Sequence, residues 1–151
     1  MDAFTLLKAD HEKVADIFEK LEPTTERGVK TREDLFTRLY SELDVHARIE
    51  EEIFYPALRE ADQTHDLILE AYEEHAVVKQ LLSELDELSK DDETWGAKLT
   101  VLQENVEHHV DEEENELFPK ARKVLSTEEA EALGERLEAA KQQAKSASSS
   151  F

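Results

Sequence analysis

The sequence predicts an all-α fold, an up-down-up-down four-helix bundle with a short additional C-terminal helix. Three observations support this prediction. The chain has 151 residues, the size of one domain, and only three Gly and three Pro interrupt a composition that favours helices. Apolar residues recur every three or four positions along four long segments. The connections between these segments are short and polar, which favours antiparallel neighbours.

Helix starts and stops can be assigned in chain order. Asp2 is a suitable N-cap for the first helix, and Pro23 ends it. The second helix follows a loop rich in Thr and Gly, and Pro56 is expected to kink or shorten its end. The third helix ends before the polar stretch "SKDDET", and the fourth carries Pro119 near its end. The four apolar stripes run, in order, over Phe4–Leu21, Leu35–Ala57, Ile68–Leu85 and Leu99–Leu117.

A further helix start is predicted after the bundle. The stretch "STEE" at residues 126–129 places a Ser/Thr cap before acidic residues, a pattern typical of a helix N-terminus. We therefore divide the chain into a four-helix bundle at 1–125, a C-terminal helix packed on it at 126–145, and a disordered tail at 146–151.

Composition excludes several classes of function. The formal net charge of -20 would repel phosphate backbones and anionic membrane surfaces, so neither nucleic acid nor membrane partners are expected. The chain shows neither a signal peptide nor an apolar run that could span a bilayer, which predicts a cytoplasmic protein. The acidic surface permits a monomer without requiring one, so we expect a monomer or weak homodimer. The absence of Cys excludes thiolate ligands, so any metal must be held by His and carboxylates.

Each apolar stripe is interrupted by one histidine, and the four histidines are predicted to share a layer. His11 and His46 lie about equally far from the loop between them, and so do His75 and His109. In antiparallel helices such pairs lie at the same height. His46 is followed four residues later by Glu50, and His109 by Glu113. Residues four apart lie on the same helix face.

Carboxylates in a bundle core favour a bound cation. An unpaired buried carboxylate is costly, and a metal ion supplies the opposing charge. Four imidazoles and two carboxylates exceed what one ion needs, so two ions that share the carboxylates fit better. Nitrogen and oxygen ligands suit iron, although ligand type leaves manganese and zinc open. The predicted ligands are His11, His46, Glu50, His75, His109 and Glu113, with no catalytic residue beyond them.

Four segments of the chain resemble the hemerythrin-like, or HHE cation-binding, family. They are "DHEKV" at His11, "HARIEEEIFYP" at His46, "EEHAVVKQL" at His75 and "HHVDEEENELFP" at His108, and they span nearly the whole four-helix portion. The resemblance implies a non-haem di-iron centre with an oxo or hydroxo bridge, in which the two glutamates also bridge the ions. It further implies a small-molecule ligand, which would be dioxygen, nitric oxide or peroxide.

One position departs from the oxygen carriers of this family. They have a second histidine four residues after the one that matches His75, whereas this chain has Lys79. A protonated lysine does not ligate iron. Both ions would then keep an open position, whereas an oxygen carrier needs one protected position. We therefore expect an oxidoreductase-like reaction with peroxide, as in a catalase, or with nitric oxide. The alternatives are a dioxygen- or iron-binding sensor or storage module without turnover, and a bundle whose histidines hold no metal.

Other polar residues near the layer receive ordinary interpretations. His108 is expected at the surface or behind the ligands, with a pairing to Glu113 left open, and His65 at a helix junction. Phe54 and Leu117 are expected to form a hydrophobic floor, and the acidic runs beside the glutamates to be solvated faces. Three tyrosines are expected to be packing residues, with iron ligation by one of them left open: Tyr40, Tyr55 and Tyr72.

Overall fold

The structure, a computed structural model, describes residues 1–149, with side chains described through residue 146. All regular structure in these residues is helical, which confirms the predicted all-α class. The segments are α1 (Ala3–Leu21), α2 (Val29–Ile49), η1 (Glu50–Phe54), α3 (Tyr55–Leu58), α4 (His65–Glu87), α5 (Glu93–Glu112), η2 (Glu113–Leu117), α6 (Phe118–Val124) and α7 (Thr127–Ser149).

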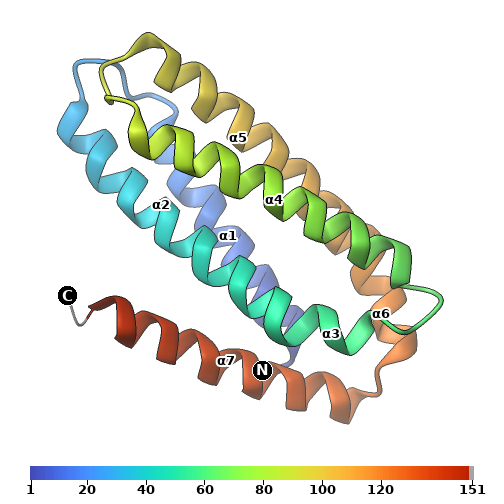
Figure 1. Ribbon diagram of the computed structural model, residues 1–151. Helices are drawn as coiled ribbons and strands as arrows, with labels where there is room; N and C mark the ends of the chain where they lie inside the picture. Colours follow the sequence, from blue (N-terminus) through green and yellow to red (C-terminus); the bar gives the residue numbers. More distant parts are fainter. Residues whose placement is uncertain (150–151) are drawn as a thin grey trace.

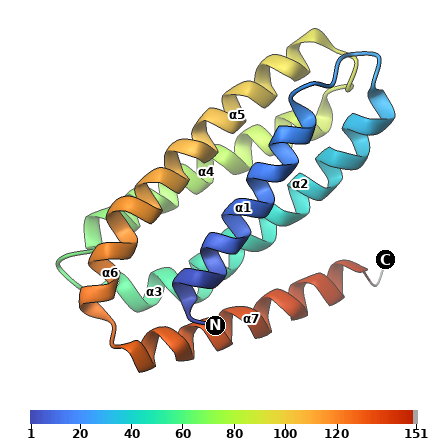
Figure 2. The same ribbon diagram turned by 180° about the vertical axis from the view of Figure 1, so that it is seen from behind.

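Four long helices form the bundle, as predicted. α1, α2, α4 and α5 alternate in direction, with α1 packed on α2 and α4 packed on α5 (Figure 1). α7 lies along the outside of the bundle against α1 and α2, and the N-terminus lies beside it in the view from behind (Figure 2). No helix among residues 1–149 combines the length and the apolar character needed to cross a membrane.

Side-chain caps begin the helices where the sequence predicts them. Asp2 Oδ1 accepts the backbone N–H of Thr5 at 2.8 Å at the start of α1. At the start of α7, Ser126 Oγ accepts the N–H of Glu129 at 3.1 Å while Glu129 Oε1 accepts the N–H of Ser126 at 2.9 Å. This reciprocal pair is a capping box, and it explains why the chain turns into a new helix after α6.

Pro56 and Pro119 do not stop their helices directly. Instead, each proline follows a short π-helical segment, η1 before Pro56 and η2 before Pro119, and the helix then continues as α3 or α6. In both segments a backbone N–H reaches back five residues, from Tyr55 to the Glu50 carbonyl and from Phe118 to the Glu113 carbonyl. Proline has no N–H to donate to the preceding turn. The wider π-helical turn accommodates this loss without breaking the helix.

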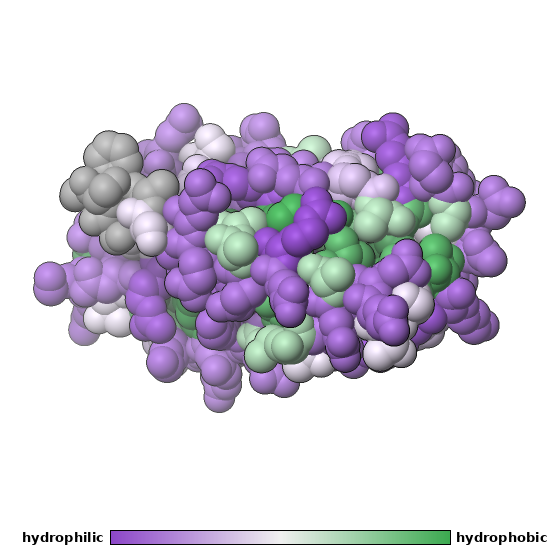
Figure 3. All heavy atoms as spheres, turned by 90° about the horizontal axis from the view of Figure 1, so that it is seen from below, coloured by the Kyte–Doolittle hydropathy of each residue, from purple (hydrophilic) through white to green (hydrophobic). Residues whose placement is uncertain are grey.

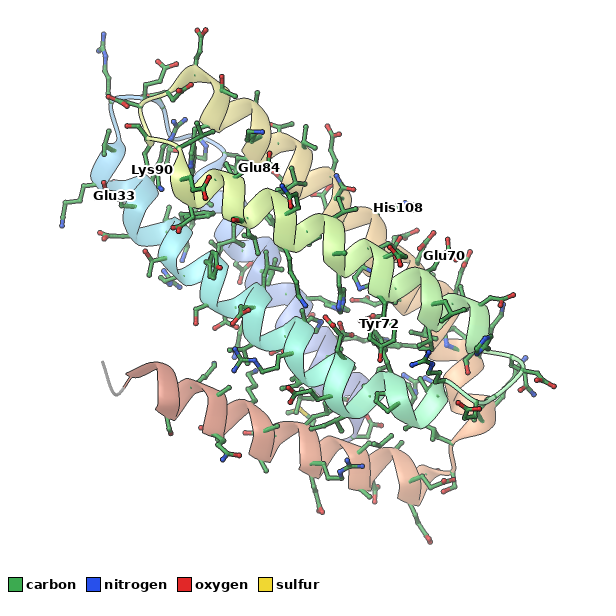
Figure 4. All side chains as sticks on the ribbon, in the orientation of Figure 1. Glu33, Glu70, Tyr72, Glu84, Lys90 and His108 are labelled. Carbon is green, nitrogen blue, oxygen red and sulfur yellow. The ribbon has the colours of Figure 1, made fainter. Side chains whose placement is uncertain are left out.

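Tyr72 satisfies a backbone group that the first π-helical segment leaves free. The Glu51 carbonyl loses a helical donor because the Tyr55 N–H bonds to Glu50 and because Pro56 has no N–H. The Tyr72 hydroxyl donates to this carbonyl at 3.3 Å, reaching across from α4 as Figure 4 shows. Tyr72 is therefore a packing residue, as predicted, with an additional role in holding η1.

The apolar core is divided into two clusters. One contains Phe4, Leu7 and Phe118 near the α3, α6 and α7 end of the bundle, and the other contains Phe18, Leu39 and further residues toward the opposite end. The layer of buried histidines and glutamates lies between them. Apolar packing thus lies on both sides of the polar layer along the bundle axis.

α7 extends further than the sequence predicts. It is helical from Thr127 to Ser149, so the predicted disordered tail is helical over its first residues, 146–149, and residues 150–151 lie outside the described part. The reason is that Ala- and Ser-rich sequence can continue a helix that is already docked. The inner face of α7 buries Leu133 and Leu137 against the bundle. Seen from below, the surface of the molecule is mostly hydrophilic with a narrow hydrophobic strip (Figure 3).

A glycine permits the close approach of α7 to α1. A Cβ added at Gly134 would lie 2.2 Å from the Met1 carbonyl oxygen and 2.9 Å from the Ala3 backbone nitrogen. Backbone atoms cannot move aside as a flexible side chain can. The N-terminus and α7 therefore fit together only with a residue that has no Cβ.

We expect Gly134→Ala to destabilise the protein by about 1–3 kcal/mol, the usual effect of overpacking. A loss of stability would be informative, because Gly→Ala inside a helix normally increases stability. Urea unfolding of the variant would measure the loss. Gly96→Ala is the matched control, since its Cβ would lie 3.8 Å from the Arg32 side chain, an ordinary contact, and no loss is expected there. Equal stability of the two variants would contradict the close approach.

Candidate metal centre

The six predicted residues come together in one buried layer. His11, His46, His75 and His109 project from α1, α2, α4 and α5, and Glu50 and Glu113 are the first residues of η1 and η2. All six are at most 8% exposed. The paired sequence repeat therefore builds two equivalent halves of one site, one from each pair of helices.

Each glutamate lies between two histidines of different helices. Glu50 Oε1 is 3.2 Å from His46 Nε2 and 3.2 Å from His75 Nε2. Glu113 places Oε1 3.1 Å from His11 Nε2 and Oε2 3.2 Å from His109 Nε2. Both carboxylates thus span the two pairs of imidazoles.

The donor atoms fall into two overlapping groups. One comprises His11, His46, Glu50 and Glu113, and the other comprises Glu50, His75 and His109, with the donor atoms of each group within 4.8 Å of one another. Two buried atoms of this layer, His46 Nε2 and Glu50 Oε2, have no hydrogen-bond partner among the described residues. Although Glu50 Oε1 lies near His46 Nε2, that contact lacks hydrogen-bond geometry. Unsatisfied buried donors and acceptors at the convergence of six ligand-type side chains fit a metal site.

Electrostatics in the metal-free layer point to the same conclusion. Burial opposes the charged imidazolium, but the Glu50 carboxylate and a hydrogen bond to Asp10 raise the pKa of His46 to about 10. Burial also opposes charge on His109, whose pKa is nevertheless raised well above 6.5 by hydrogen bonding with Glu113. Burial likewise disfavours charge on Glu113, yet hydrogen bonds with Glu50 and His109 hold its pKa well below 4.5. Protons on His46 and His109 therefore supply positive charge that a cation would supply instead.

The second nitrogen of every layer histidine contacts a carboxylate. The contacts are His11 Nδ1 to Glu114 at 2.6 Å, His46 Nδ1 to Asp10 at 3.0 Å, His75 Nδ1 to Glu51 at 2.8 Å and His109 Nδ1 to Glu74 at 2.6 Å. Such a contact fixes the proton on Nδ1 and turns Nε2 toward the centre of the layer, as in known carboxylate–histidine–metal arrangements. We call these four acids the outer carboxylates.

The outer carboxylates connect the four helices in a closed ring. Asp10 precedes His11 on α1 but holds the histidine of α2, and Glu51 follows Glu50 but holds the histidine of α4. Glu74 precedes His75 on α4 but holds the histidine of α5, and Glu114 follows Glu113 but holds the histidine of α1. Each outer carboxylate therefore orients a residue on the neighbouring helix. The sequence interpretation of the acidic runs as solvated faces is wrong for Glu51 and Glu114.

Tyr55 belongs to the layer, whereas the sequence predicted a packing residue. It is fully buried, and its hydroxyl donates to Glu113 Oε2 at 2.6 Å and lies 3.1 Å from Glu50 Oε1. The same oxygen is 3.3 Å from His75 Nε2 and 3.4 Å from His109 Nε2. Burial and the charge of Glu113 raise the pKa of Tyr55 well above 10, so the phenol stays protonated in the metal-free layer.

Lys79 and His108 lie outside the layer. Lys79, at the position of the missing fifth histidine, directs its ammonium to Glu51 at 3.1 Å, and its side chain is half exposed. His108 is exposed on the outer side of α5 (Figure 4) and pairs with Glu112 at 3.1 Å rather than with Glu113. His65 begins α4, with Nδ1 2.7 Å from the Arg59 carbonyl, as expected for a residue at a helix junction.

Apolar residues surround the layer on the remaining sides. Phe54 and Leu117 are buried as expected for a floor, and Phe118 stacks on the His11 ring with a centroid distance of 6.3 Å. On the opposite side a cavity of about 60 Å³ reaches the four histidines. Its other lining residues are Val14, Tyr40, Leu43, Asp44, Ala47, Val78, Lys79, Leu82, Val106 and Val110. The space is large enough for a small molecule, since about 10–15 Å³ of such volume already holds one water.

Comparisons with known proteins agree with this geometry. Residues 2–121 match the family described as hemerythrin HHE cation binding domain. The chain is 30% identical over 141 residues to a protein of Nostoc sp. named DNA nickase, covering 93% of this chain but only 39% of that protein. It is 33% identical over 144 residues to the uncharacterized protein Rv2633c of Mycobacterium tuberculosis, covering 92% of this chain and 84% of that one. The crystal structure of a hemerythrin HHE cation binding domain-containing protein from Mycobacterium kansasii, a homologue of Rv2633c, superposes with a TM-score of 0.86 at 30% identity, over 97% of this chain and 89% of the other.

Proposed function

The chain belongs to the hemerythrin HHE cation-binding family, and from this premise we propose that it is a non-haem di-iron protein that reacts with hydrogen peroxide or nitric oxide. The observation that carries the proposal is the sharing of Glu50 and Glu113 between two pairs of histidines. His11 and His46 would hold one ion, His75 and His109 the other, and both glutamates would bridge. When bound, a pair of irons supplies two redox-active Lewis acids to a small oxidant.

The protein residues prepare the site for such a reaction in three ways. The outer carboxylates hold all four imidazoles with Nε2 inward, so little reorganisation accompanies ion binding. The Tyr55 hydroxyl keeps a proton beside Glu113 and Glu50, where it can be given to a developing anion. The mostly apolar cavity beside the four histidines favours small uncharged molecules over charged metabolites.

Lys79 supports redox chemistry over reversible oxygen carriage. Its ammonium pairs with Glu51, so it adds no ligand on the His75 side. Each ion would then keep a position free for an incoming molecule, whereas a carrier needs one protected position. A nucleic-acid substrate, which the name of the Nostoc relative suggests for that protein, is disfavoured here, because a net charge of -20 opposes binding to a phosphate backbone and this chain spans only 39% of that relative.

The test is to load the protein with ferrous iron without oxygen, measure the iron content, and then add the two reactants separately. We expect two irons per chain, consumption of hydrogen peroxide by the oxidised form, and an absorbance change when nitric oxide meets the reduced form. Glu113→Ala protein, treated identically, is the control for iron bound elsewhere. Reversible colour changes under oxygen and vacuum cycles without peroxide turnover would instead favour a sensor or storage module. Failure to hold iron would reject both.

A further inference from the structure

The C-terminal helix supplies a buried cation to the shell around the metal centre. α7 lies outside residues 2–121, the part that matches the family. Its Lys141 is only 7% exposed, and its ammonium donates to Asp10 Oδ1. A lysine that is buried between α7 and the bundle requires a partner for its charge, and Asp10 provides one.

Asp10 connects this cation to a layer histidine. Its other oxygen, Oδ2, lies 3.0 Å from His46 Nδ1. Lys141, Asp10 and His46 thus form a continuous line from α7 through α1 to α2. Both carboxylate oxygens of Asp10 are engaged, so its side chain cannot rotate without breaking one of the two contacts.

This arrangement distinguishes Asp10 from the other outer carboxylates. The side chain of Asp10 is 2% exposed, whereas those of Glu51, Glu74 and Glu114 are 23%, 23% and 30% exposed. Glu51 also has a lysine partner, Lys79, but that lysine is half exposed. Water can therefore replace a lost partner at the other three acids, whereas removal of Lys141 would leave Asp10 as a buried carboxylate with one partner fewer.

We infer that Lys141 is a positioning residue through which the docking of α7 controls the ion held by His11 and His46. The inference rests on the proposed two-ion centre and adds an asymmetry to it. With Lys141 in place, Asp10 is fixed and holds the His46 ring toward the layer. Without Lys141, Asp10 loses one of the two contacts that fix its orientation, so its hold on the His46 ring weakens and the ion on that side is released first. The ion between His75 and His109 depends on Glu51 and Glu74 and stays.

The test compares three variants loaded with iron. Lys141→Met removes the charge and keeps the length of the side chain, Lys141→Arg restores a cation, and Lys145→Met is the matched control on the same helix. Lys145 contacts Glu42 at 3.5 Å and is partly exposed. The rate of iron transfer to a chelator is followed, together with the electron paramagnetic resonance signal of the iron that remains.

In Lys141→Met we expect one iron to leave about 10–100-fold faster than in the wild type, the usual effect of losing a contact behind a metal ligand. The remaining iron should then give the signal of a single ferric ion. Lys141→Arg and Lys145→Met should lose iron at the wild-type rate. Loss of both irons together, or an unchanged rate in Lys141→Met, would overturn the inference. A wild type that holds fewer than two irons would instead count against the proposed function.

A measurement on the metal-free protein separates positioning from folding. The Nδ1–H of His46 should give a hydrogen-bonded proton signal in a nitrogen-15 NMR spectrum of the wild type. In Lys141→Met this signal should exchange faster with solvent, while circular dichroism shows the same helix content. An unchanged His46 signal would reject the line of contacts whether or not iron binds.

Discussion

Glu113→Ala is expected to abolish binding of both ions, and Glu50→Ala to do the same. Glu113 contacts His11 with one oxygen and His109 with the other, so its removal affects both halves of the layer. It also removes one of the two buried glutamates whose negative charge would neutralise the ions. Loss of an ordinary contact behind a ligand costs about 10–100-fold in affinity, and loss of a shared ligand should exceed that.

Metal content after iron loading and gel filtration would measure this effect. Glu116→Ala is the matched control, because Glu116 lies on the same π-helical segment but is exposed. It should keep the wild-type iron content. His65→Ala, at the helix junction remote from the layer, should also keep it. Retention of one iron in Glu113→Ala would mean that the glutamate belongs to one ion and does not bridge.

The buried layer of histidines and glutamates could be predicted because its signals are periodic. A histidine on an apolar stripe must face the core, and antiparallel helices bring residues equally far from a loop to the same height. Glu50 and Glu113 followed because residues four apart share a helix face. The structure places all six as this reasoning predicts, since packing in a four-helix bundle leaves little freedom in register.

The π-helical segments and Tyr55 could not be predicted in the same way. Sequence spacing assumes a regular helix, whereas η1 adds a residue to one turn and shifts every later side chain around the axis. With regular turns Tyr55 would face away from Glu50, five residues earlier. In the wider turn its hydroxyl lies beside that carboxylate. Pro56 indicates a perturbed helix, but it does not show that the turn before it widens into a π-helical segment.

The outer carboxylates left a signal that sequence analysis missed. Each of them is the immediate neighbour of a predicted ligand: Asp10 beside His11, Glu51 beside Glu50, Glu74 beside His75 and Glu114 beside Glu113. Neighbouring residues on one helix point in directions about 100° apart, so the second of each pair faces the adjacent helix. An acid beside a core ligand therefore predicts a contact to the next helix. The contact from Lys141 could not have been found, because nothing in the sequence fixes how α7 docks.

The stability of the metal-free protein is expected to fall as pH rises from about 6.5 toward 10. The folded pKa of His46 is raised from 6.5 to about 10, and that of His109 is raised in the same direction. A raised imidazole pKa contributes stability that is fully present below the unfolded pKa and is lost as pH rises through the folded one. Each such imidazole contributes a slope of up to about 1.4 kcal/mol per pH unit.

At acidic pH the stability of the metal-free protein is expected to fall as pH decreases, because carboxyl pKa values are lowered on folding. The pKa of Asp10 is lowered from 3.8 to about 2, against the effect of burial, by His46 and Lys141, and that of Glu113 is also lowered. Their contribution is present above the unfolded pKa values and is lost as pH falls through the folded ones. The metal-free protein should therefore be most stable between about pH 4.5 and 6.5. Bound metal takes the place of the imidazole protons, so the loaded protein should not show the loss above pH 6.5.

Urea unfolding at intervals from pH 4 to pH 9 checks this, with the scan ending before lysines and tyrosines of the unfolded chain titrate near pH 10. His46→Gln is the informative variant, because it removes one of the two imidazoles with a raised pKa and should flatten the decline above pH 6.5. A metal-free wild type whose stability is constant or rises from pH 6.5 to pH 9 would mean that protons do not balance the buried carboxylates. The layer would then have no electrostatic need for a cation, and the physical reason for placing metal there would be lost.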